Sequence, residues 1–363
     1  MEFTAGFTLI GGGTFIAPSP PPPPSLYHWG NTFNGAYSSP TQLGSAISWS
    51  QIAGPQLGIT TDGKIYGWGD YGISGAPDSS PPYGYSNPVQ IGTDTDWSKI
   101  TASGPAGAIK TNGTLWTWGG NNSVGQLGLG GTTPFSSPKQ VGALTTWAYV
   151  SAGVAQMHAI KTDGTLWAWG KNQWGYLGLG NTTYYSSPKQ VGALTNWSSV
   201  TGGNHNTMAI KTNGTLWGWG RNYQGAIGLG DTAQRNSPVQ VGALTNWSKI
   251  SSGYHWCVAI KTDGTLWSWG FNYGGLGLGN TSFYSSPKQV GALTNWLDVT
   301  AGFYASVAIK TDKTLWSWGK NHLGQLGQGD TISKSSPVQV GSNTSWVILS
   351  TSGGTTNQYA AIG

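Results

Sequence analysis

The acidic and imidazole side chains of this 363-residue chain are few and lie far apart. The five histidines are His28, His158, His205, His255 and His322. Aspartates recur instead in one repeated turn phrase, at Asp62, Asp163, Asp263 and Asp312. General acid/base catalysis needs two titratable groups in different environments, and a metal site needs ligands that converge. The spacing brings neither together, so we predict no catalytic residue and no metal site.

Cofactor binding is not indicated either. The glycine-rich stretch 125–130 and its copies match phosphate-binding loops weakly, because neither Lys-Ser/Thr nor a helical pattern follows them. The single cysteine, Cys257, lies in an apolar stretch and is expected to be a small buried group. We therefore predict a non-enzymatic protein without a cofactor.

Aromatic side chains at positions that vary between copies of a repeat are the remaining candidates. Positions that are identical in every copy are fixed by the fold. Residues with a specific function are therefore expected at positions where the copies differ. Two variable stretches occur in each repeat, one after Trp-Gly-x-Asn and one before Ser-Pro. Aromatics on such loops can stack on a surface glycan or anchor a protein receptor, or they can pack on a neighbouring repeat. The candidate binding residues are Phe135, Trp174, Tyr184, Tyr185, Tyr223, Gln234, Arg235, Tyr273, Phe283, Tyr284, His322 and Lys334.

The elements that position these residues follow from seven Trp-Gly pairs, the first at Trp29 and the last at Trp318. Five of the six intervals are 49 to 51 residues long, which indicates a repeat protein. An alternating run such as 160–170, broken by Asp163-Gly164, predicts a β-hairpin with a tight turn. A second Trp before a β-prone stretch and a Pro-headed strand bring each repeat to four strands, as in a propeller blade.

The two ends of the chain predict how the ring closes. Residues 360–363 align with the first hairpin strand, and residues 26–30 align with the second. Six intact hairpins and this split one make seven blades, and pairing of the terminal strands leaves no long free edge. We predict an all-β, seven-bladed β-propeller over residues 26–363, with almost no helix.

The repeated sequence motif is long and specific for one family of repeats. It reads Ala-Ile-Lys-Thr-Asp-Gly-Thr-Leu-Trp-x-Trp-Gly-x-Asn, then Gly-x-Leu-Gly-Leu-Gly-x-Thr, then Ser-Pro-x-Gln-Val. Over about residues 26 to 363 it resembles the repeat of the regulator-of-chromosome-condensation propeller family. The resemblance implies seven blades and little about activity, since the family includes GTPase exchange factors, chromatin binders and secreted bacterial inhibitors. The loops 31–40 and 70–88 depart from the pattern, and no repeat is lengthened into the wedge of an exchange factor.

The charge is low and evenly distributed. Only 8% of residues are charged and the formal net charge is +5. Many lysines occupy one equivalent position, at Lys110, Lys161, Lys211, Lys261 and Lys310, where we expect a solvated ring at the rim. A nucleic-acid binder would gather Lys and Arg on one face. With only Arg221 and Arg235 as arginines, no nucleic-acid partner is predicted.

Residues 1–25 lie outside the repeat. Residues 1–17 carry the apolar side chains Phe3, Phe7, Leu9, Ile10 and Phe15, and residues 18–25 form a proline-rich linker expected to be a stiff spacer. Glu2 and the Gly11–Gly13 run fit a signal peptide poorly, and the segment is too short to insert across a membrane. It is either a disordered tail or an anchor that docks onto a structural protein of a larger assembly.

Two functional hypotheses follow. In the first, the chain is a display module on a virion or extracellular surface, such as a phage decoration or fibre protein. Residues 1–17 then anchor it, and the loop aromatics recognise a receptor. In the second, it is a soluble, cytoplasmic regulator or inhibitor that binds one protein with a face of the propeller, and residues 1–17 are dispensable.

Overall fold

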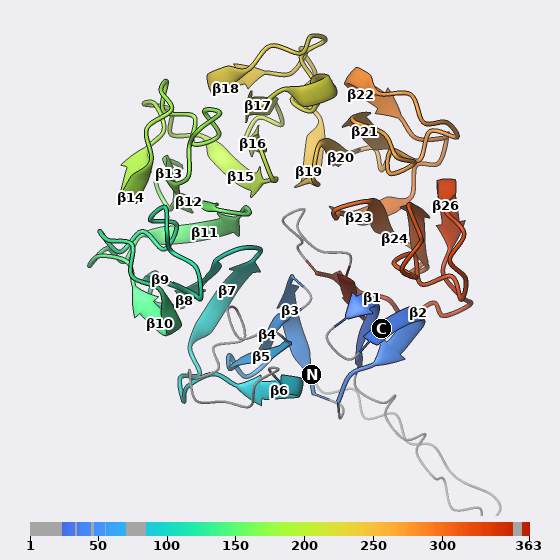
Figure 1. The fold of residues 1–363 in the computed structure, drawn as a ribbon, viewed down its shortest axis with the longest axis horizontal. Helices are drawn as coiled ribbons and strands as arrows, with labels where there is room; N and C mark the ends of the chain where they lie inside the picture. Colours follow the sequence, from blue (N-terminus) through green and yellow to red (C-terminus); the bar gives the residue numbers. More distant parts are fainter. Residues whose placement is uncertain (1–23, 33–34, 45–46, 55, 70–84, 351–357) are drawn as a thin grey trace, which may run out of the picture.

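The strands form a closed ring of seven sheets. The computed structural model describes residues 24–32, 35–44, 47–54, 56–69, 85–350 and 358–363. Within these ranges the chain forms 28 strands and one 3-10 turn, η1 (Tyr223–Gly225). The strands make seven four-stranded antiparallel sheets around a central axis (Figure 1). The predicted all-β, seven-bladed propeller is therefore confirmed.

The first four blades share one order of strands, in which the innermost strand comes first along the chain. Blade 1 comprises β3 (Trp49–Ala53), β4 (Leu57–Thr60), β5 (Ile65–Gly69) and β6 (Tyr85–Gln90). Blade 2 comprises β7 (Trp97–Ala102), β8 (Ala106–Lys110), β9 (Leu115–Gly119) and β10 (Phe135–Gln140). Blade 3 comprises β11 (Trp147–Ala152), β12 (Gln156–Lys161), β13 (Leu166–Gly170) and β14 (Tyr185–Gln190). Blade 4 comprises β15 (Trp197–Gly202), β16 (Asn206–Lys211), β17 (Leu216–Gly220) and β18 (Arg235–Gln240).

The remaining blades keep the same arrangement from the axis outward. Blade 5 comprises β19 (Trp247–Ser252), β20 (Trp256–Lys261), β21 (Leu266–Gly270) and β22 (Tyr284–Gln289). Blade 6 comprises β23 (Trp296–Ala301), β24 (Ala305–Lys310), β25 (Leu315–Gly319) and β26 (Lys334–Gln339). Blade 7 comprises β27 (Ile348–Leu349), β28 (Gln358–Ile362), β1 (Leu26–Thr32) and β2 (Gly35–Gln42).

The ends of the chain meet in blade 7, as the sequence predicted. The N-terminal strand β1 pairs antiparallel with the C-terminal strand β28, with Leu26 opposite Ile362 and Trp29 opposite Tyr359. The strands β1 and β28, from opposite ends of the sequence, consequently share one blade (Figure 1). The ring is closed by main-chain hydrogen bonds in the same way that each other blade is held together.

In five blades the Trp of the Trp-Gly pair joins its blade to the loop of the blade before it. Trp169, which is fully buried, donates its indole N–H to the carbonyl of Gln126 at 3.1 Å. The same bond recurs from Trp219, Trp269, Trp318 and Trp29 to the carbonyls of Tyr176, Ala226, Gly275 and Gln325. The repeated Trp therefore serves packing between blades, which explains why it occurs in every copy.

The lysines expected on a solvated rim are largely buried, which corrects that prediction. Lys211, Lys261 and Lys310 are only 5–6% exposed. Each ammonium lies between two tryptophans of its own blade, and for Lys310 the ring centroids of Trp316 and Trp296 are 3.5 and 4.8 Å away. An aromatic face attracts a cation, so these lysines help to order the Trp pairs.

Candidate functional site

The loops of the propeller emerge at two ends. The long loops after β9, β13, β17, β21 and β25 lie at the same end as the short loops between the first and second strands of blades 2 to 6, because the strands alternate in direction. We call this end the loop face. The opposite end, with the tight turns between the second and third strands of blades 1 to 6, is the turn face.

The long loops of the loop face are held in shape by their own repeated residues. In the loop after β13, the side-chain carbonyl of Asn172 accepts the backbone N–H of Leu177 at 2.9 Å, and its amide donates to the carbonyl of Asn181. Gly178 has φ +73°, and a Cβ there would lie 2.8 Å from the indole nitrogen of Trp219 in the next blade. The repeated Asn and Gly residues thus fix the loop, and the residues between them are presented from a rigid base.

Aromatic side chains gather where the long loops after β17 and β21 meet the inner loops of blades 5 and 6. Seven rings form a closed circuit of close contacts, with centroids 4.1–6.1 Å apart. We call this circuit the aromatic patch. Its members, in order of contact, are Tyr223, Phe271, Tyr273, Tyr304, Phe303, Tyr254 and His255. Tyr223 and Tyr273 are 44% and 50% exposed, so the patch presents ring surface to solvent.

Two cations are held at the edge of the patch. The Arg221 guanidinium lies over the rings of Trp174 and Tyr223, 4.9 and 5.3 Å from their centroids. The Lys320 ammonium lies over Tyr304 and Tyr273, at 4.5 and 5.2 Å. Stacking on aromatic rings restricts these long side chains before any partner arrives, which lowers the entropy cost of binding.

Two histidines beside Arg221 are uncharged at neutral pH. Burial and the positive charges of Arg221 and Lys171 lower the pKa of His205 to about 4. Burial, His205 and Arg221 likewise lower the pKa of His255 to about 4. The two rings contact one another at 5.4 Å and behave as neutral aromatic surface.

Carboxylates are segregated away from the patch. Of the nine aspartates in the described ranges, six lie at the turn face and Asp298 lies in the central channel. The other two, Asp231 and Asp330, lie at the outer edge of the loop face, where they pair with Arg235 at 2.6 Å and Lys334 at 3.1 Å. The patch is therefore aromatic and positively charged, and it suits association with a partner surface rather than proton transfer.

Within the described part of the chain, no three His, Cys, Asp or Glu side chains come together as a metal site would require. The same residues include no helix with the length and apolar character needed to cross a bilayer.

Comparison with known families supplies the relationship. The regulator of chromosome condensation (RCC1) repeat model matches residues 112–159, 163–210, 213–260, 263–309 and 312–357, which together span more than half the chain. A second RCC1 repeat model matches residues 197–226 and 296–325. The chain belongs to the RCC1 repeat family. This confirms the resemblance found in the sequence.

Solved RCC1-type propellers share the fold at low sequence identity. Human WBSCR16 is 17% identical, with a TM-score of 0.81 over 94% of this chain and 98% of that one. Yeast RCC1 (Prp20) bound to Kap60 is 18% identical, with a TM-score of 0.82 over 94% and 89%. Prp20p from Saccharomyces cerevisiae, described with its binding to Gsp1p and histones, is also 18% identical, with a TM-score of 0.81 over 94% and 91%. Comparison with curated protein sequences gives no significant match.

The RCC1 fold brings together one group of the predicted binding residues. Tyr223 and Tyr273 are members of the patch, Trp174 contacts it through Arg221, and His322 contacts Tyr304 at 6.1 Å. All four come from the variable stretch after Trp-Gly-x-Asn. This stretch is therefore the part of the sequence prediction whose residues lie close together in the structure.

Five members of the patch were missed by sequence reasoning. They are Tyr254, His255, Phe271, Phe303 and Tyr304. A signal was present, because the short loop after the inner strand reads Val-Ala, Asn-His, Tyr-His and Phe-Tyr in blades 3 to 6. A two-residue difference does not show which face of the ring the loop occupies, so the sequence alone did not select it.

The other predicted group is spread around the perimeter. These residues begin the outer strands of separate blades, or directly precede them, and are Phe135, Tyr184, Tyr185, Gln234, Arg235, Phe283, Tyr284 and Lys334. Phe135, Tyr185 and Tyr284 each lie beneath a lysine of their own strand, 5.5–5.9 Å from it. Whether any of the twelve predicted residues binds a ligand stays a prediction. The predicted anchor residues Phe3, Phe7, Leu9, Ile10 and Phe15 lie outside the described residues.

Proposed function

We propose that this chain is a non-enzymatic protein-binding module whose loop face docks onto a partner protein through the aromatic patch. The observation that supports it best is the closed circuit of seven rings, with Tyr223 and Tyr273 about half exposed. Tyr, Trp and Arg dominate the binding energy of protein interfaces, and rigid aromatics bind with little loss of side-chain entropy.

The aromatic patch is not a requirement of the propeller. Blade 3 carries Val154 and Ala155 at the inner-loop positions that hold Tyr254 and His255 in blade 5. Both blades nevertheless have the same four-stranded sheet and the same inter-blade indole hydrogen bond. Since one set of residues suffices for the fold, the aromatic set in blades 5 and 6 supports a role in recognition.

The comparisons supply a precedent for such use. The yeast Prp20 structures are described with Kap60, Gsp1p and histones as proteins that Prp20 binds. At 18% identity these partners belong to Prp20 alone, and only the use of the fold as a protein-binding platform enters this proposal.

The proposal follows the second hypothesis from the sequence, a cytoplasmic regulator or inhibitor. Membership of the RCC1 family favours it over phage virion display, for which the comparisons offer no support. The display hypothesis depends on residues 1–17, which lie outside the described residues and have no part in this proposal.

A pair of matched double variants tests the proposal. Replacing Tyr223 and Tyr273 with serine removes the exposed rings of the patch, while replacing Tyr184 and Phe283 with serine removes rings of similar exposure, 41% and 53%, from the perimeter. Both variants should melt near the wild-type temperature. We expect the patch variant to reduce recovery of its partner at least about tenfold, because truncating an aromatic hot-spot residue costs about 2 kcal/mol of binding free energy or more.

The readout is quantitative mass spectrometry of proteins that co-purify from the native source. The perimeter variant and a chain lacking residues 1–17 should retain the partner. Loss of the partner from the perimeter variant, with retention by the patch variant, would refute the proposal.

A further inference from the structure

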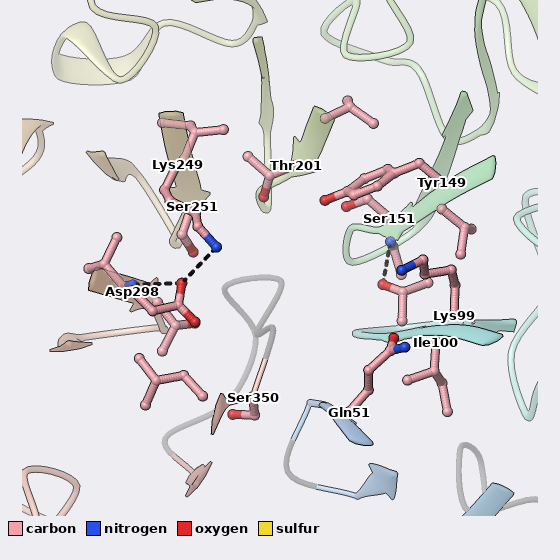
Figure 2. Close-up of a pocket in the computed structure, with 18 residues that line it drawn as sticks. Gln51, Lys99, Ile100, Tyr149, Ser151, Thr201, Lys249, Ser251, Asp298 and Ser350 are labelled. Carbon is pink, nitrogen blue, oxygen red and sulfur yellow. Dashed lines mark hydrogen bonds and ion pairs between the residues drawn. The ribbon is translucent and has the colours of Figure 1, made fainter. Parts of the chain in front are cut away.

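The central channel contains a cavity, partly open to solvent, that the proposed function does not use. A cavity of about 300 Å³ lies on the ring axis, between the innermost strands of the blades. Side chains from all seven blades line it (Figure 2). Its size is at the lower end of the range for ligand pockets, so any occupant is small.

One position of the innermost strand varies between the blades, and only lysine occurs there twice. It is the second residue after the first Trp of each strand, and it holds Gln51, Lys99, Tyr149, Ser199, Lys249, Asp298 and Ile348. The residue that follows it is Ile, Val or Leu in all seven copies. Five of the seven variable residues line the cavity, namely Gln51, Lys99, Tyr149, Lys249 and Asp298. The repeat therefore keeps the neighbouring position apolar and leaves this position free to carry a specific chemistry.

Hydroxyl groups form the second layer of the channel lining. Thr101 accepts the backbone N–H of Ala152 at 2.9 Å, and Ser251 accepts that of Ala301 at 2.9 Å. Ser151 and Thr201 accept the corresponding N–H groups of the next blades at 3.4 Å. Each hydroxyl that accepts such a bond retains its own hydrogen. The channel is thus lined by hydrogen-bond donors at regular intervals.

The charged groups of the lining are unevenly placed. Lys249 and Asp298 lie beside each other, 3.8 Å apart, and Asp298 also accepts the N–H of Val299 at 3.0 Å. Lys99 lies across the channel from this pair (Figure 2), and no aspartate among the described residues pairs with it at ion-pair distance. Tyr149 directs its hydroxyl toward the channel (Figure 2). Burial, together with the negative charge of Asp298, raises the pKa of Tyr149 to about 12, so it stays a donor.

We propose that the channel binds a small oxyanion, a phosphate or a short carboxylate, on the side of Lys99 and Tyr149. Lys99 supplies the counter-charge, and the hydroxyls of Tyr149 and Ser151 donate hydrogen bonds to the oxygens. Asp298 opposes anion binding and is partly neutralised by Lys249. The site shares no residue with the aromatic patch, so it can be tested independently of the proposed function.

Titration calorimetry of the full chain tests this inference with two probes, inorganic phosphate and succinate. We expect saturable binding of at least one probe, and the tighter of the two identifies the class of oxyanion. Lys99→Met should weaken that binding at least about tenfold, since it removes a charge-assisted hydrogen bond. Asp298→Asn should tighten it, because the like charge is removed. Lys189→Met, on an outer strand, should leave it unchanged.

The opposite signs of the two channel variants distinguish a site from a change in folding. Melting temperatures of all variants are measured in the same buffer. If Lys99→Met unfolds, Lys99→Gln takes its place. Absence of binding by both probes would overturn the proposal. So would equal affinities for wild type and the Lys99 variant, or weaker binding after Asp298→Asn.

Discussion

Replacing Trp169 with alanine is expected to lower the free energy of unfolding by about 3–5 kcal/mol, the usual cost of removing a buried Trp. Trp169 is fully buried in a cluster that joins Ile109 and Leu115 of blade 2 to blade 3. Its indole also donates the inter-blade hydrogen bond to Gln126. Alanine leaves a cavity and an unsatisfied carbonyl at the same place, so both effects destabilise the ring.

Trp174 provides the control, because it is the same residue type on the loop face of the same blade. It is only partly buried and contacts Arg221. Trp174→Ala should therefore cost about 1 kcal/mol or less, the value of an exposed cation–π contact. Chemical denaturation of both variants gives the comparison. Equal losses would show that the repeated Trp does not join the blades.

Acidification from pH 6.5 to pH 4 is expected to remove about 3 kcal/mol of stability through His158 alone. His158 is fully buried, and burial lowers its pKa from 6.5 to about 4. Its Nε2 lies 3.1 Å from the carbonyl of Tyr176, which only accepts hydrogen bonds, so the neutral ring carries its proton there. The carbonyl is shared with the hydroxyl of Thr207 at 2.8 Å.

The direction follows from the lowered pKa. Between pH 6.5 and pH 4 the unfolded chain binds a proton at His158 that the folded chain does not, so stability is complete above pH 6.5 and falls as the pH is lowered. His158→Met removes this contribution and matches Met208 at the equivalent position of the next blade. Between pH 6.5 and pH 4 the free energy of unfolding of this variant should fall less steeply than that of the wild type. The difference in slope should correspond to the uptake of about one proton fewer on unfolding. An unchanged slope would show that His158 does not titrate on unfolding.

The fold could be predicted from the sequence because the same pattern of strands and turns recurs in successive repeats. The Trp-Gly period predicted the blades, and the alignment of residues 360–363 with a hairpin strand predicted that the terminal strands pair, which the structure shows for β1 and β28. The side chains between the strands were less predictable. The lysine ring was expected in solvent, since strand patterning places Lys310 beside a turn but does not reveal that Trp296 and Trp316 enclose it.

The candidate site could be predicted only in part, and the reason is topological. Comparison of copies selected the stretch that contains Tyr223 and Tyr273, because it varies within a constant frame. The contribution of Tyr254 and Phe303 depends on which loops share an end of the ring and which blades are neighbours. The perimeter residues varied equally between copies, and only the three-dimensional arrangement separates them from the patch.

The measurement that tests the central claim most directly is site-specific photo-cross-linking from the loop face. A benzoylphenylalanine at position 273, inside the patch, is compared with one at position 283 on the perimeter and one at position 244 on the turn face. The native residues Tyr273, Phe283 and Leu244 are 50%, 53% and 48% exposed, so the three probes are equally accessible. We predict a discrete cross-linked partner protein from position 273 alone. Cross-linking from position 283 or 244, and none from position 273, would contradict the assignment of the aromatic patch as the binding surface.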